Sequence, residues 1–145
     1  MNKVILTYRT PNGNIGEESV WVKPVGEYYQ VDNIPFFAPN IAVGDIISVE
    51  GDDGFLHFNE LISLSGHSTV QIAVLDVKEK DRIIKQIEIF KCTWEGFKRI
   101  IAIDIPPLLE YKKIKHFLQS ELEKQVIDYK EACLSDKHRS EVYEN

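Results

Sequence analysis

The sequence predicts an α+β protein made of two halves, and two patterns support this. In residues 1–65, short runs rich in β-branched and aromatic residues alternate with turn signals, which is typical of a small β-barrel or a strongly bent sheet. In residues 66–134, strand-like runs alternate with two stretches whose apolar residues recur at helical spacing. We expect residues 135–145 to form a polar, frayed C-terminal tail.

Five short strands are predicted in the first half. They cover residues 4–8, 19–25, 28–32, 45–50 and 55–63. Asn12-Gly13 separates the first two, and this pair supplies the positive φ values that a tight turn requires. Gly26 turns the second strand into the third. We therefore expect a five-stranded, β-barrel-like or bent-sheet half.

Strands and helices alternate in the second half. The predicted strands cover residues 70–75, 91–95, 98–105 and 127–134, and the predicted helices cover residues 76–90 and 109–125. In the second helix Ile114, Phe117, Leu118 and Leu122 share one face. The order strand, helix, strand, strand, helix, strand is that of a ferredoxin-like βαββαβ unit, with both helices on one face of an antiparallel sheet.

The two cysteines match no metal-binding or redox spacing, and we interpret them as buried thiols. In a ferredoxin-like unit the second and fourth strands lie at opposite edges of the sheet. Cys92 and Cys133 fall on these two strands. We therefore expect their Cα atoms to lie beyond the roughly 7 Å that a disulfide can span.

Charge is distributed unevenly along the chain. Residues 1–69 hold nine acidic and three basic residues, so the whole net charge of −6 lies there, while residues 70–145 hold fourteen of each. Such a surface repels nucleic acid and anionic membranes and attracts a cationic protein partner. A solubilising surface without any partner is the alternative.

Targeting signals are not found in the sequence. No run of about 18 apolar residues exists that could span a membrane. Only Val4, Ile5 and Leu6 are apolar in succession near the N-terminus, which is too short for the core of a signal peptide. We therefore expect a cytoplasmic protein without a membrane partner.

Residues 31–45 form a segment that matches neither a helix nor a strand, and it contains Phe36 and Phe37 between two prolines. One interpretation is that a ring is presented to a partner as an aromatic anchor. The interpretation that we favour for at least one ring is structural: it plugs the junction between the halves. That reading requires a ring buried against both halves, near residues 65–69.

His67 is the sharpest catalytic candidate. It lies in the sequence SGHST at residues 65–69, where an imidazole beside hydroxyls can act as a base for Ser68 or for water. Asp32 or Asp45 would then orient the ring. The structural alternative, which we favour, is that these polar groups hydrogen-bond the backbone at the start of a strand. Adjacent strand residues also point to opposite faces, so His67 and Ser68 need not meet.

A metal or cofactor site is not predicted. The four histidines are scattered, and neither an HxxxH nor a CxxC spacing occurs. Asp52 and Asp53 lack the further ligands of a calcium loop. The sequence also has no phosphate-binding glycine loop and no GxSxG motif.

Six blocks of the chain resemble a bacterial family catalogued as domain of unknown function 4265. These blocks are residues 20–26 (VWVKPVG), 31–39 (VDNIPFFAP), 44–45 (GD), 65–70 (SGHSTV), 104–107 (DIPP) and 129–134 (YKEACL). The resemblance extends over nearly the whole chain. It implies a small, soluble bacterial protein and assigns no activity, catalytic residue or cofactor.

Three functional hypotheses follow. The leading one is a non-catalytic protein-binding module of the immunity or antitoxin type, which neutralises a basic, nuclease-like toxin through acidic residues in predicted turns: Glu17, Glu18, Glu50, Asp52 and Asp53. The second is a small-molecule-sensing regulatory domain, by analogy with other ferredoxin-like units. Its pocket or junction residues would be Asp32, Phe36, Phe37, Asp45, His67 and Ser68. The third is a hydrolase that uses His67.

Overall fold

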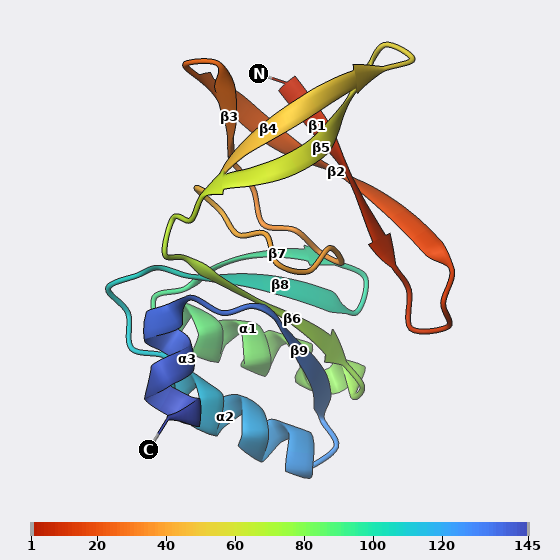
Figure 1. The fold of residues 1–145 in the computed structure, drawn as a ribbon. Helices are drawn as coiled ribbons and strands as arrows, with labels where there is room; N and C mark the ends of the chain where they lie inside the picture. Colours follow the sequence, from red (N-terminus) through yellow and green to blue (C-terminus); the bar gives the residue numbers. More distant parts are fainter. Residues whose placement is uncertain (1, 145) are drawn as a thin grey trace.

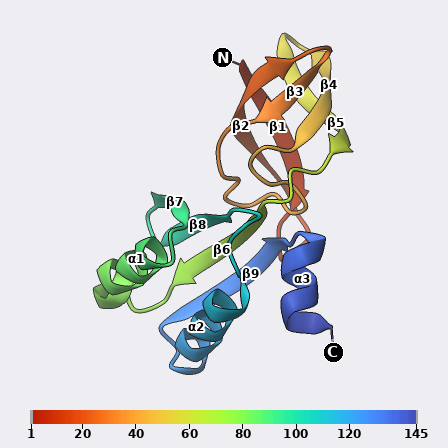
Figure 2. The same cartoon turned by 90° about the vertical axis from the view of Figure 1, so that its left-hand side faces the viewer.

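A computed structural model describes residues 2–144 of the chain. It has mixed α+β architecture with two sheets (Figure 1). The first sheet contains the N-terminal strands alone, and the second carries the helices (Figure 2). Within residues 2–144, no helix is both long enough and apolar enough to cross a membrane.

The N-terminal sheet is strongly bent. Its strands are β1 (Asn2–Arg9), β2 (Ile15–Val25), β3 (Tyr28–Val31), β4 (Ile46–Asp52) and β5 (Phe55–Ser63). Consecutive strands pair antiparallel, and eight residue pairs join β1 to β2. Only two parallel pairs, Val4–Leu56 and Ile5–His57, join β1 to β5. The sheet therefore meets itself at one short contact and is not a barrel hydrogen-bonded along its full length.

The second sheet has four antiparallel strands in the order β7-β8-β6-β9. The strands are β6 (Ser68–Val74), β7 (Thr93–Phe97), β8 (Ile100–Ile105) and β9 (Ile127–Cys133). A 3₁₀ turn, η1 (Val77–Glu79), leads into α1 (Lys80–Ile89), and α2 (Lys112–Glu123) precedes β9. Both helices lie on one face of the sheet (Figure 2).

Burial follows the predicted patterns in this half. Ile83 and Ile87 of α1, with Ile114 and Leu118 of α2, are buried in the core against alternate residues of the strands. Strands β7 and β9 lie at opposite edges of the sheet, as predicted. Cys92, just before β7, and Cys133, at the end of β9, are both free thiols.

The C-terminal residues form a helix, α3 (Asp136–Tyr143), so the prediction of a frayed tail is wrong. Ser135 caps this helix, since its Oγ accepts a hydrogen bond from the His138 N–H at 3.1 Å. His138 itself is fully buried. The prediction rested on the polar composition of these residues. It failed because the helix is anchored by a buried imidazole, at His138, and not by an apolar stripe.

Segment 32–45 lies against the face of the second sheet that α1 and α2 leave open. The Ile34 N–H donates to Glu95 Oε2 at 2.8 Å, and the Asn40 N–H donates to the Ala132 carbonyl at 2.8 Å. Gln71 Nε2 donates to the Pro35 carbonyl at 3.3 Å. The segment therefore joins the two sheets through hydrogen bonds to both edges and the centre of the second one.

The prediction that an aromatic ring plugs this junction is wrong. The buried apolar residues of the segment are small or aliphatic: Ile34, Ala38, Ile41 and Ala42. Phe36 is half-buried and Phe37 is 41% exposed. Both rings instead line a cleft between the halves.

Candidate functional site

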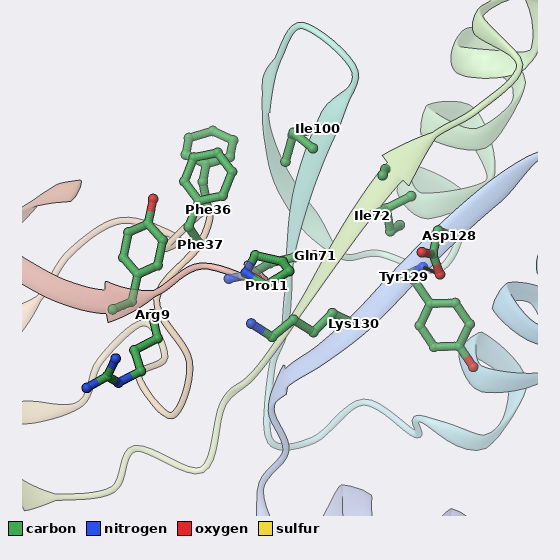
Figure 3. Close-up of a pocket in the computed structure, with 12 residues that line it drawn as sticks. Arg9, Pro11, Phe36, Phe37, Gln71, Ile72, Ile100, Asp128, Tyr129 and Lys130 are labelled. Carbon is green, nitrogen blue, oxygen red and sulfur yellow. Dashed lines mark hydrogen bonds between the residues drawn. The ribbon is translucent and has the colours of Figure 1, made fainter. Parts of the chain in front are cut away.

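An open cleft of about 280 Å³ lies between the two halves, and we call it the interhalf cleft (Figure 3). The first half contributes one wall, formed by Tyr8, Arg9, Pro11, Phe36 and Phe37. The open face of the second sheet contributes the floor and the opposite rim, formed mainly by Gln71, Ala73, Ile100, Asp128 and Lys130. The cleft therefore exists only where the two halves meet.

Its aromatic wall is held in place by stacking. The Phe37 ring stacks on Tyr8, with centroids 5.8 Å apart and planes at 17°, and Phe36 lies 6.3 Å from Phe37. The Tyr8 ring packs over Gly16, where a Cβ atom would lie only 2.5 Å from Tyr8 Cζ. Gly16 thus lets the tyrosine lie flat on β2 and support Phe37.

Glu18 fixes the backbone that carries these rings. Its carboxylate accepts hydrogen bonds from the N–H groups of Phe36, Phe37 and Ala38 at 2.9, 2.8 and 2.6 Å. Partial burial, with the negative charge of Glu18 nearby, raises the pKa of Tyr8 above its usual 10.0, so the phenol is neutral. The aromatic wall is therefore preorganised before any ligand arrives.

The floor of the cleft follows from the alternation of side chains along β6. Ile72 packs with the helices, so Gln71 and Ala73 face the opposite side, toward the cleft. Ala73 pairs with Ile100 on one neighbouring strand and with Asp128 on the other. A small side chain in the middle of the sheet leaves the hollow, and larger neighbours surround it.

Charged groups lie at the ends of the cleft. Lys130 extends along the side where Pro11 and Arg9 lie, whereas Asp128 is at the other end, beside Tyr129 (Figure 3). Within residues 2–144, the ion pairs include neither Arg9 nor Lys130. The cleft thus has an apolar middle, Lys130 at one end and Asp128 at the other, and Arg9 lies at the rim with its guanidinium pointing away from the aromatic rings (Figure 3).

His67 is paired with a residue that the sequence did not suggest. Its Nδ1 lies 2.8 and 3.1 Å from the two carboxylate oxygens of Asp104. Burial raises the pKa of Asp104, and the hydrogen bond with His67 opposes this rise. Asp45 is buried and accepts from the Ala42 and Ser65 N–H groups instead, both at 2.9 Å. The expected orienting role of Asp32 or Asp45 is therefore wrong.

Ser68 connects β6 to α3 through hydrogen bonds. Its Oγ lies 2.6 Å from His138 Nδ1 and accepts the Ser135 N–H at 2.8 Å. His138 Nε2 in turn donates to the Leu109 carbonyl at 2.8 Å. Ser68 is thus hydrogen-bonded to His138 and not to His67. His67 and Ser68 therefore do not form the base–nucleophile pair that the hydrolase hypothesis requires.

The five acidic residues expected to face a basic partner do not form one surface. Glu17 and Glu18 lie in β2, so their predicted position in a turn is wrong, and Glu18 is occupied by the backbone of segment 36–38. Glu50 and Asp52 lie in β4 and Asp53 in the following turn, all three exposed. The β4–β5 turn and the β1–β2 loop project from different ends of the first half (Figure 1).

The residue types that can ligate a metal are dispersed over the described part of the chain. Across residues 2–144, histidine, cysteine and acidic side chains do not gather in groups of three or more that could hold a metal ion.

Asp32 is exposed, and its backbone N–H donates to the Trp21 carbonyl at 2.8 Å. This position beside β2 makes it part of the strand pairing.

Sequence reasoning missed several residues of the cleft, namely Tyr8, Arg9, Ala73, Ile100 and Lys130. Ala73 did leave a signal, since it is the one small residue in the run VQIAVL. Asp104 left one too, as an acid inside an isoleucine-rich strand. Which of these residues meet depends on how the halves pack, and the strand patterns do not encode that.

Comparison with known proteins identifies a family and a fold. The model of the family described as Domain of unknown function (DUF4265) matches residues 18–129. A crystal structure of a hypothetical protein from Neisseria gonorrhoeae is similar, with a TM-score of 0.85 and 31% identity, over 92% of this chain and 95% of that chain. No curated protein gives a match.

Proposed function

This chain belongs to the DUF4265 family, whose description names no activity, and from its site geometry we propose a non-catalytic binding module. Its ligand is a small, largely apolar molecule that occupies the interhalf cleft. The observation that carries this proposal is the preorganised aromatic wall facing a floor hollowed at Ala73.

A bound ligand would contact both halves at once. Phe36 and Phe37 belong to the segment that joins the halves, and Ala73 belongs to the central strand of the second sheet. Occupancy therefore stabilises one arrangement of the halves over others, which is the property a sensing or regulatory domain needs.

The second half supports this reading by analogy. Its strand order β7-β8-β6-β9 and its two helices on one face favour a ferredoxin-like assignment, which we include in the proposal. Such units serve in many roles, so the fold alone assigns none. The non-catalytic character is supported by Ser68, whose hydroxyl is committed to His138, and by the absence of His67 from the cleft lining.

The test uses the neutral apolar dye N-phenyl-1-naphthylamine, whose fluorescence rises in an apolar site. We expect saturable binding to the wild-type protein and loss of at least about tenfold in affinity in Ala73→Phe, because the new ring fills the hollow. The control is Val77→Phe, which adds a ring at an exposed position on η1, away from the cleft.

Two results would contradict the proposal. One is a dye affinity in Ala73→Phe equal to that of the wild type. The other is an equal loss of affinity in Val77→Phe. Circular dichroism of both variants establishes that they remain folded, so that a lost signal reports on the cleft.

A second candidate function is the immunity or antitoxin type. What favours it is the end of the β4–β5 hairpin, where exposed Glu50, Asp52 and Asp53 accompany Phe55, which is 61% exposed. Carboxylates there would steer a cationic partner, and the ring would anchor it. This surface is smaller than the one that the sequence predicted, since it leaves out Glu17 and Glu18.

This candidate predicts a basic nuclease as the product of the adjacent gene. The purified nuclease should bind the wild-type chain, and Asp52→Asn/Asp53→Asn should weaken that binding by about tenfold at low salt, because two steering charges are removed. Glu17→Gln is the control at the other end of the half. The lack of any basic product among neighbouring genes, or an unaltered affinity in the double variant, argues against it.

A further inference from the structure

We propose that the ligand of the interhalf cleft is an organic anion: an apolar body carrying one carboxylate or sulfonate group, which Arg9 and Lys130 bind. This inference rests on the proposed function and adds the chemical class of the ligand. It comes from the charges at the rim of the cleft, whereas the proposed function comes from the apolar middle.

Neither cation is neutralised by a carboxylate of the described chain, and both line the cleft, which is what distinguishes them from the other unpaired basic residues. Arg82, Lys115, Lys124 and Lys137 each pair with a carboxylate. Within residues 2–144, neither Arg9 nor Lys130 takes part in an ion pair, and both line the cleft. Their donors are therefore available to an external acid.

The position of Arg9 adds to this argument. The first half holds only three basic residues and a net charge of −6, yet one of the three lies at this rim. The opposite half supplies Lys130 from β9 at the same end of the cleft (Figure 3). Two cations from different halves thus line one apolar hollow of an acidic protein, with the exposed Arg9 guanidinium turned outward in Figure 3.

The geometry also sets the orientation of the ligand. Its apolar body lies between the rings of Phe36 and Phe37 and the floor at Ala73. Asp128 at the far end repels a second acidic group, so the single acid points toward Arg9 and Lys130. The exposed Arg9 side chain points away from Phe36 and Lys130 in Figure 3, so it turns toward the cleft on binding, where its guanidinium can hold a planar carboxylate through two parallel N–H donors.

A matched pair of dyes tests the class of ligand. 8-Anilinonaphthalene-1-sulfonate is N-phenyl-1-naphthylamine with one added sulfonate. The net charge of −6 by itself disfavours the anion, so a preference for it has to come from local cations. We expect the wild type to bind the sulfonate at least about threefold more tightly, and this advantage to shrink between about 50 and 500 mM salt.

Neutralising the two cations should remove the preference without closing the cleft. In Arg9→Gln/Lys130→Gln the sulfonate dye should lose its advantage over the neutral dye or bind more weakly than it, with the neutral dye bound as in the wild type within about twofold. The matched control is Lys23→Gln/Lys113→Gln, which removes the same charge at exposed positions, one in each half, away from the cleft. It should retain the preference.

Carboxylate recognition is tested by displacement. Decanoate should displace the bound sulfonate dye at a lower concentration than decan-1-ol, which has the same chain without the charge. Arg9→Gln/Lys130→Gln should abolish that difference. Equal displacement by acid and alcohol in the wild type would overturn the inference.

The outcomes separate this inference from the proposed function. If the wild type binds both dyes equally, or if both double variants lose the preference for the sulfonate alike, the proposal that the ligand is an organic anion is wrong. The proposed function then still stands, provided that Ala73→Phe abolishes binding of the neutral dye. If Ala73→Phe leaves the neutral dye bound, the cleft is not a binding site and both proposals fail.

Discussion

Glu18 shows how one side chain shapes the candidate site. In the sequence it is one of nine acids in an acidic half, with nothing to distinguish it from Glu17 beside it. In the structure its carboxylate accepts three backbone N–H groups of segment 36–38, while Glu17 is exposed on the opposite face of β2. Charge-assisted hydrogen bonds of this kind are stronger than neutral ones.

Substituting Glu18 should therefore lower the stability of the fold more than substituting Glu17. We expect Glu18→Gln to lower the free energy of unfolding by about 1–2 kcal/mol, because an amide offers one acceptor oxygen to three donors. Urea unfolding measures this value. Glu17→Gln is the matched control and should change it by less than about 0.5 kcal/mol. Equal effects would mean that the three hydrogen bonds do not stabilise the fold.

Glu121 joins the two helices and responds to pH. Arg82 donates to its carboxylate from Nη2 at 2.6 Å and from Nη1 at 3.2 Å, and the Glu121 side chain is 3% exposed. These hydrogen bonds lower the pKa of Glu121 below its ordinary 4.5 in the folded state. The unfolded chain thus binds a proton more readily, so the pair stabilises the fold above pH 4.5 and loses this effect as the pH falls through the folded pKa.

We expect Glu121→Gln to be less stable than the wild type at neutral pH by about 1–2 kcal/mol. That difference should narrow as the pH falls below 4.5, because the wild-type carboxylate becomes protonated. Denaturant unfolding at a series of pH values measures it. Glu123→Gln, exposed on the same helix, should show no such pH dependence. A difference that is constant with pH would contradict the assignment.

At the scale of elements, α3 is stabilised by its contacts and not by its own sequence. The His138 imidazole of this helix bridges Ser68 Oγ and the Leu109 carbonyl. Glu141 of the same helix accepts the Tyr111 N–H at 2.7 Å, at the start of α2. The helix thus satisfies polar groups on β6 and on the loop before α2. This explains why a polar octapeptide folds onto the second half.

Replacing His138 should therefore loosen the whole element. We expect His138→Ala to lower the free energy of unfolding by about 2–3 kcal/mol, because it leaves a cavity and unpaired buried groups at Ser68 and Leu109. Hydrogen exchange should also accelerate across residues 136–143. Arg139→Ala, exposed on the same helix, is the control and should leave both measurements unchanged. An unchanged exchange rate in His138→Ala would rule out this anchor.

At the scale of the whole molecule, the two halves are tied together at several points. Glu95 accepts the Ile34 N–H, Gln71 donates to two carbonyls of segment 35–38, and Thr69 Oγ1 donates to the Ile41 carbonyl. Buried polar groups of the second sheet thus depend on the first half for partners. We infer that the halves unfold as one cooperative unit.

The tryptophans provide a direct measurement, since Trp21 is in the first half and Trp94 in the second. In Trp94→Phe the fluorescence reports the first half alone, and in Trp21→Phe it reports the second. We expect each variant to show the same urea midpoint by fluorescence and by circular dichroism, because both halves unfold together. Midpoints that differ between the two probes within either variant would show that the halves unfold separately.

The sequence by itself determined the elements other than α3, because side-chain periodicity depends only on local backbone geometry. The isoleucines of α1, the alternation along β6 and the order of strands and helices in the second half are all readable from spacing. The aliphatic residues of segment 31–45 carry no such period, and the prediction that Phe36 or Phe37 is the residue buried at the junction is wrong, since Ile34 is buried there instead.

Only the tertiary structure decided which distant residues meet. Asp104 reaches His67, Glu18 holds segment 36–38, and Arg9 lies at the same cleft as Lys130, although these partners are far apart in the chain. Such contacts depend on how the bent N-terminal sheet packs on the second sheet, and no local pattern specifies that packing. The candidate site and the docking of α3 are made of such contacts, which is why the other elements were predictable and the site was not.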